Sequence, residues 1–105
     1  MAEILLETQQ ITYDDMDDIM YKFKFVANGT ERNKIQVQKS QLKVFKFCLD
    51  NYINFHDGTR IIKFVNQSSY TDMTIQIPNQ TDIHYKLFDS EKQAWGKYLT
   101  DNGLL

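Results

Sequence analysis

The chain has 105 residues, a formal net charge of −2 and a single cysteine, Cys48. This length accommodates one domain, residues 1–105, with one hydrophobic core, and a lone cysteine excludes an intramolecular disulfide. Apolar residues make up 42% and charged residues 25% of the chain, which is typical of folded globular proteins. No stretch resembles a secretion signal or reaches membrane-spanning length, so we expect a soluble cytoplasmic protein without a membrane partner.

The N-terminal third predicts a hairpin. Residues 3–11 fit either a strand or a short helix, because their periodicity does not decide between the two. Thr12 followed by Asp15 is typical of a capped helical turn. Residues 19–26 then alternate as a strand does, and Asn28-Gly29 predicts a tight turn into a returning strand over residues 32–39. The side chains expected to face the core are those of Ile19, Tyr21, Phe23, Phe25, Ile35 and Val37.

A helix is predicted over residues 41–54, with Ser40 as its N-cap. At about 100° per residue, the apolar side chains gather on one half of the helical wheel. This half consists of Leu42, Val44, Phe45, Cys48, Leu49, Tyr52 and Ile53. Phe47 instead projects among polar residues, and we interpret it as an anchor for a protein interface or a homodimer.

The second half of the chain predicts a turn at residues 56–59 and strands at 60–65, 72–77 and 83–88. Ser90 with Gln93 has the spacing of a capping box, and a helix over 91–101 follows, ended by Asn102-Gly103. The order (β)ββα-βββα predicts the α+β class, with one antiparallel sheet of about five or six strands and both helices packed on one face.

An acidic run is the sharpest local feature, and it consists of Asp14, Asp15, Asp17 and Asp18. Four carboxylates in five positions are able to attract a divalent cation, but the run lacks the alternating ligands and glycine of a calcium loop. Its alternative interpretations are a solvated loop or a contact for the basic surface of a protein partner. Of the functional interpretations, we favour the protein contact.

A second charged surface depends on the strand phases. The residues expected on the outer sheet face include five lysines, Lys22, Lys24, Lys34, Lys63 and Lys86, accompanied by Gln36, Gln38, Thr74, Gln76 and His84. No carboxylate is expected on this face. The alternative function is therefore a nucleic-acid-binding module that uses a Lys/Gln-rich sheet face.

The sequence gives little support to catalysis. Cys48 is expected in the core, His56 and His84 are isolated, and the four glycines form no phosphate-binding loop. We therefore expect no enzyme, no cofactor and no metal ligand.

Composition points to an origin in a genome poor in G and C, because the chain has ten lysines but two arginines and is rich in Ile, Asn, Phe and Tyr. Small acidic proteins of this size are typical of phage and mobile-element inhibitors. The expected function is thus a non-enzymatic inhibitor or accessory protein of a low-GC bacterium or its phage, of the anti-CRISPR, anti-restriction or immunity kind. It would block a defence nuclease or toxin through the acidic run, with Phe47 or Trp95 as an apolar anchor.

Overall fold

The computed structural model describes residues 3–105, which form seven strands, one 3-10 turn and two helices. In chain order these elements are β1 (Glu3–Tyr13), β2 (Met16–Ala27), β3 (Thr30–Gln38), η1 (Lys39–Gln41), α1 (Leu42–Asn51), β4 (Phe55–Asp57), β5 (Arg60–Asn66), β6 (Tyr70–Gln76), β7 (Ile83–Phe88) and α2 (Asp89–Asp101).

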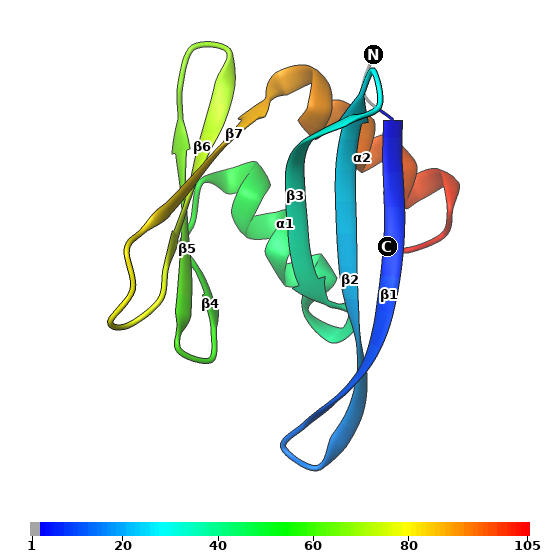
Figure 1. The fold of residues 1–105 in the computed structure, drawn as a ribbon, viewed down its shortest axis with the longest axis vertical. Coiled ribbons are helices and arrows are strands. Elements are labelled where there is room, and N and C mark those ends of the chain that lie inside the picture. The colour runs from blue at the N-terminus through cyan, green and yellow to red at the C-terminus, as the bar shows by residue number, and fades with distance from the viewer. Residues whose placement is uncertain (1–2) are drawn as a thin grey trace.

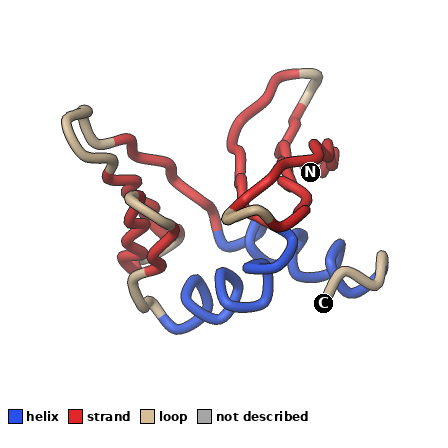
Figure 2. The backbone as a smooth tube through the Cα atoms, turned by 90° about the horizontal axis from the view of Figure 1, so that it is seen from below, coloured by secondary structure: helices blue, strands red, loops and turns tan. Residues whose placement is uncertain are grey.

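Two antiparallel sheets replace the single sheet that the sequence predicts. The first has the order β1-β2-β3 and the second has the order β4-β5-β6-β7 (Figure 1). Both helices lie on one side of the sheets, which splay apart above them (Figure 2). The α+β class is confirmed, but one sheet of five or six strands is wrong. Every strand pairs with its sequence neighbour through a hairpin, and α1 interrupts that series without bringing β4 beside β3.

The first hairpin settles the open question at the N-terminus, because residues 3–13 form a strand. Leu6 lies opposite Phe23 in the β1–β2 ladder and packs against the core. The predicted helical turn at Thr12 is wrong: β1 continues through Tyr13, and Asp14 and Asp15 form a turn with φ of 50° and 61°. Positive φ at both central residues is the geometry of a type I′ hairpin turn.

The second hairpin is the one that Asn28-Gly29 predicts. These two residues have φ of 53° and 76°, and β2 and β3 pair on either side of them. Phe23 and Phe25 are fully buried, as their alternation predicts. Gln38 and Thr74, which the sequence predicts on the solvent-facing outer face, are buried, although Thr74 does lie in register with Lys63 and His84.

The boundaries of α1 differ from the prediction at both ends. Ser40 does not cap the helix, because it lies in η1 and donates its hydroxyl to Asp18. The helix ends at Asn51, where Tyr52 takes a left-handed conformation (φ 56°) and the amide of Ile53 bonds to the carbonyl of Cys48 at 2.9 Å. This early end leaves Tyr52 and Ile53 exposed, and Val44 lies beside the buried stripe, so the apolar half of the predicted wheel is not buried at these three positions.

The second half matches its predicted strands closely but adds a short one, β4, where the sequence predicts only a turn. The predicted capping box of Ser90 and Gln93 is wrong. Phe88 is the N-cap residue of α2, and its amide donates to Oε1 of Glu91 at 3.0 Å. Trp95 and Leu99 are buried on one stripe of α2.

Aromatic side chains join the two sheets through the helices. The ring of Phe45 on α1 makes edge contacts with Phe55 and Phe64 of the second sheet, at centroid distances of 5.2 and 5.5 Å. It also contacts Trp95 of α2 (5.8 Å), which in turn contacts Phe23 of the first sheet (5.6 Å). One core therefore serves both sheets, since each buries its apolar face against the same pair of helices.

Candidate functional site

The β1–β2 hairpin extends well beyond the rest of the first sheet. These strands pair from Glu3–Val26 to Tyr13–Met16, whereas β3 accompanies β2 only from Met20 onward. Residues 10–19, which we call the arm, are therefore a two-stranded ladder that projects from the body (Figure 1). A two-stranded hairpin alone is marginally stable in water, so the arm depends on its junction with the sheet.

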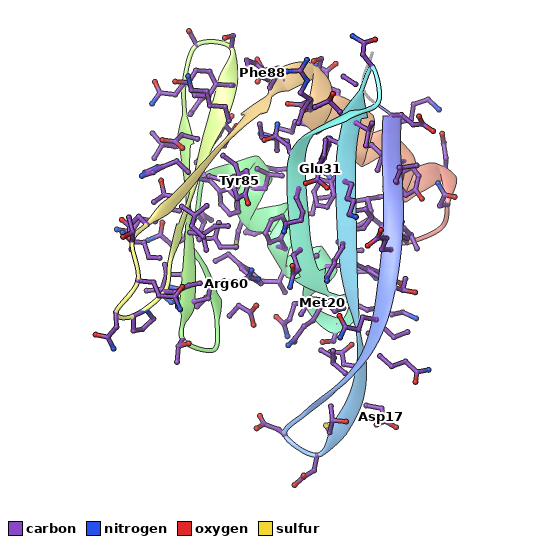
Figure 3. The ribbon with its side chains drawn as sticks, viewed as in Figure 1. Asp17, Met20, Glu31, Arg60, Tyr85 and Phe88 are labelled. Carbon is purple, nitrogen blue, oxygen red and sulfur yellow. The ribbon has the colours of Figure 1, made fainter. Side chains whose placement is uncertain are left out.

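Three of the four predicted carboxylates lie together at the end of the arm. Asp14 and Asp15 form the turn and Asp17 follows on β2, and all three residues are exposed. Asp17 lies at the far end of the molecule in Figure 3. Met16 is 71% exposed between them. We call Asp14, Asp15, Met16 and Asp17 the tip. The tip thus presents three negative charges and one apolar side chain on a narrow support.

The fourth carboxylate, that of Asp18, has a different position and partner set. It accepts a hydrogen bond from the hydroxyl of Ser40 at 2.5 Å and another from the amide of Ile19 at 2.8 Å. The Ser40 hydroxyl holds the pKa of Asp18 below its usual range. Asp18 therefore links the arm to η1 and, unlike the other three aspartates of the run, is only partly exposed.

Ser40→Ala should raise the pKa of Asp18 toward the ordinary range of an aspartate, because the carboxylate loses its principal donor. The folded-state pKa of Asp18 lies below the unfolded value, so its charged form stabilises the fold at neutral pH. That contribution is lost as pH falls through the folded pKa. An NMR titration of the Asp18 carboxyl carbon measures the shift, and Ser90→Ala on α2 is the control. An identical titration in the Ser40 variant would show that the hydroxyl does not act on Asp18.

Phe47 lies on the exposed side of α1, with 59% of its surface accessible. Val44, one turn earlier on the same helix, is 50% exposed. Residues three apart on a helix are neighbours, so the two side chains form a short apolar stripe. The helical wheel separated them, because it assigned Val44 to the core.

The lysines do not form the carboxylate-free face that the sequence predicts. Lys22, Lys24 and Lys34 lie on the first sheet, whereas Lys63 and Lys86 lie on the second. Carboxylates stand among them. Glu7 of β1 accepts a hydrogen bond from Lys24 at 2.8 Å. This contact lowers the pKa of Glu7 and raises that of Lys24. Asp72 lies directly opposite Lys86 in the second sheet. The prediction failed because β1 had no assigned strand phase and because it overlooked Asp72, which begins the predicted strand 72–77 and shares the outward phase of Thr74 and Gln76.

The described residues include few groups arranged as catalytic residues would be. Cys48 is buried, and this burial raises the pKa of its thiol, which opposes thiolate formation. His84 lies 3.1 Å from the hydroxyl of Thr74 and 3.6 Å from Asp72, on an exposed strand. Within residues 3–105 no three histidine, cysteine or acidic side chains are grouped as metal ligands would be.

One buried polar side chain that joins the two sheets was not identified from the sequence. Asn33 of β3 is buried, and its amide nitrogen donates to the carbonyl of Lys86 at 2.7 Å and to Glu91 at 2.8 Å. These bonds tie the first sheet to β7 and α2. The available signal was Asn33 itself, which the alternation of Ile35 and Val37 places on the inward side of β3.

No protein-family model, curated protein or solved structure matches this chain. Neither helix in the described part of the chain is long and apolar enough to cross a membrane. Inference about function therefore rests on the geometry of the arm and the surfaces around it.

Proposed function

We propose that the protein is a small non-enzymatic inhibitor or accessory protein that binds and blocks a protein partner with its acidic tip. The proposed setting is a phage or mobile element of a low-GC bacterium. The partner would be a defence nuclease or a toxin, so that the protein acts in the manner of anti-CRISPR, anti-restriction or immunity proteins. The single observation that carries the proposal is the projection of three exposed aspartates on an arm beyond the rest of the sheet.

The shape and charge of the tip suit a concave basic surface. A nucleic-acid channel is lined with lysine and arginine that neutralise phosphates, and a narrow acidic projection is complementary to it. The chain keeps Asp14-Asp15 at turn positions where Asn-Gly is the favoured pair. Two adjacent like charges do not stabilise the turn. The turn therefore departs from the preferred Asn-Gly pair at the point where negative charge is most exposed, and such departures from local preference are expected at functional sites.

Of the two apolar anchors predicted from the sequence, the structure leaves one accessible. Trp95 is 1% exposed and belongs to the core, so its prediction as an anchor is wrong. Phe47 and Val44 supply the exposed apolar stripe instead. Nucleic acid is not proposed as a second partner, since Glu7 and Asp72 lie among the lysines on which that alternative depended.

The first test is the salt dependence of partner binding. A tagged chain is used to capture its partner from phage-infected low-GC cells, and the dissociation constant of the purified pair is measured by calorimetry. Between about 50 and 500 mM salt, the affinity should fall at least about tenfold, because exposed charge pairs are screened as the Debye length shortens. An affinity that does not change over this range would remove the tip from the mechanism.

A further inference from the structure

A groove separates the two sheets on the side away from the helices. It has a volume of about 240 Å³ and is lined on one side by Lys34, Ile35 and Gln36 of β3. The opposite side and the floor are mainly apolar, with Phe45, Ile62, Met73, Ile75, Ile83 and Tyr85. Figure 3 shows Tyr85 between the two sheets and Arg60 toward one end of the gap.

Two strand edges border this groove. β3 pairs with β2 alone and β7 pairs with β6 alone. The carbonyl of Gln36 accepts a bond from Arg60 at 3.1 Å, and the carbonyl of Lys86 accepts one from Asn33 at 2.7 Å. Both carbonyls therefore point away from their own ladders and toward the opposite sheet.

Backbone groups in an antiparallel strand alternate in direction, and the N–H and C=O of one residue point to the same side. The direction of the Gln36 carbonyl consequently places the amide of Gln36, and both backbone groups of Lys34, on the open edge of β3. By the same reasoning, His84 and Lys86 present theirs on the edge of β7. Between the Asn33–Lys86 and Arg60–Gln36 bonds, β3 and β7 are not paired with each other as neighbouring strands.

Positive charge surrounds the groove. Lys34 lies on its rim, and an adjoining hollow of about 430 Å³ contains Arg32 and Lys86. Lys86 does not contribute a free charge, because Asp72 lies opposite it in the β6–β7 ladder and its Nζ lies over the ring of Tyr70, 5.3 Å from the centroid. Two other carboxylates near the groove are engaged within the fold. Asp57 is paired with Arg60 at 2.8 Å, and the buried Glu91 accepts from Asn33 and from the amide of Phe88. The rim is therefore complementary to acidic side chains.

We propose that this groove binds an extended segment of a partner protein, which adds a strand to the open edge of β3. The unpaired N–H and C=O groups of an edge strand are a template for a further strand. Successive side chains of a strand point to opposite faces, so every second residue would enter the apolar floor and the others would face Lys34 and Arg32. The expected segment thus alternates apolar and acidic residues. This surface is separate from the tip and does not depend on it.

The test uses labelled seven-residue peptides, acetylated and amidated at their ends, in which valine alternates with glutamate. Fluorescence anisotropy should give saturable binding with a dissociation constant on the order of 10–100 µM. Replacing glutamate by lysine should weaken binding at least about tenfold through repulsion at the rim. Methylating alternate backbone nitrogens should weaken it as strongly, since a strand cannot pair without its N–H groups.

Variants of the protein locate the site. Lys34→Glu should reduce affinity for the glutamate peptide at least about fivefold, whereas Lys63→Glu, on the outer face of the second sheet, should leave it unchanged. Bound peptide should also slow hydrogen exchange at the amides of Lys34 and Gln36. Neutralising the three tip aspartates should not alter peptide affinity, so this proposal and the proposed function fail separately.

Three results would overturn the proposal. The first is no saturable binding of the glutamate peptide, and the second is equal binding of its methylated or lysine counterpart. The third is a concentration-dependent dimer of the free chain in which the amides of Lys34 and Gln36 are already protected, because the edge would then belong to a second copy.

Discussion

Asn33→Ala should lower the free energy of unfolding by about 2–4 kcal/mol. The substitution removes both donors of the buried amide, so the carbonyl of Lys86 loses its partner and Glu91 loses one of its two. A buried group left without a hydrogen bond costs about 1–3 kcal/mol, and more when it is charged. Because domains of this size are stable by about 5–15 kcal/mol, the loss is a large fraction of the total.

Denaturant unfolding measures this effect conveniently, since Trp95 is the only tryptophan and is buried at the centre of the fold. The matched control is Asn51→Ala, which removes an exposed amide that bonds to the carbonyl of Phe47 on its own helix. That change should stay within about 0.5 kcal/mol. Equal losses in the two variants would show that Asn33 does not join the sheets to α2.

Glu91→Gln separates charge from hydrogen bonding at the same site. Glutamine still accepts from the Phe88 amide and from Asn33 through its carbonyl oxygen, so the cap survives while the buried charge disappears. The variant should therefore retain most of the stability that Asn33→Ala loses.

Local patterns in the sequence predicted most of the elements. Alternation placed Phe23, Phe25, Ile35 and Val37 on the inner face of the first sheet, and Asn28-Gly29 located a hairpin turn, because strand pleat and positive φ act over neighbouring residues. The prediction of Ser40 as the N-cap of α1 was wrong because its actual hydrogen bond joins residues that are distant in sequence. The hydroxyl of Ser40 bonds instead to Asp18, which is 22 residues distant in the chain. A pattern of neighbouring residues cannot predict such a contact.

The division into two sheets could not be predicted from the sequence. It depends on whether β3 and β7 pair, and side chains from opposite sheets, those of Asn33 and Arg60, occupy the carbonyls that such pairing would use. The position of the arm was also hidden, since the polar residues Thr8 and Gln10 on the inward side of β1 give no apolar alternation. The candidate acidic residues were found because they are adjacent in sequence, but their separation into an exposed tip and an anchored Asp18 follows from the hairpin register.

The second large effect is expected at the tip. Asp14→Asn/Asp15→Asn/Asp17→Asn removes three charges while keeping side chains that tolerate the turn. If each exposed pair with the partner contributes about 0.5–1 kcal/mol, the loss is about 1.5–3 kcal/mol, which is roughly a tenfold to hundredfold weaker complex. The stability of the chain itself should be unchanged or slightly higher, because repulsion between neighbouring carboxylates is relieved.

The control has the same change in charge elsewhere on the surface. Asp82→Asn/Asp89→Asn/Asp101→Asn also neutralises three exposed aspartates, all distant from the arm in sequence and none on it. This control distinguishes a contact made by the tip from a general attraction between an acidic protein and a basic one.

The most direct measurement is the dissociation constant of the captured partner for the wild-type chain and for these two triple variants, at one salt concentration. Binding through the arm predicts an affinity at least about tenfold lower for the Asp14/Asp15/Asp17 variant and close to wild type for the Asp82/Asp89/Asp101 variant. Equal affinity of all three proteins, or a greater loss in the control variant, would contradict it.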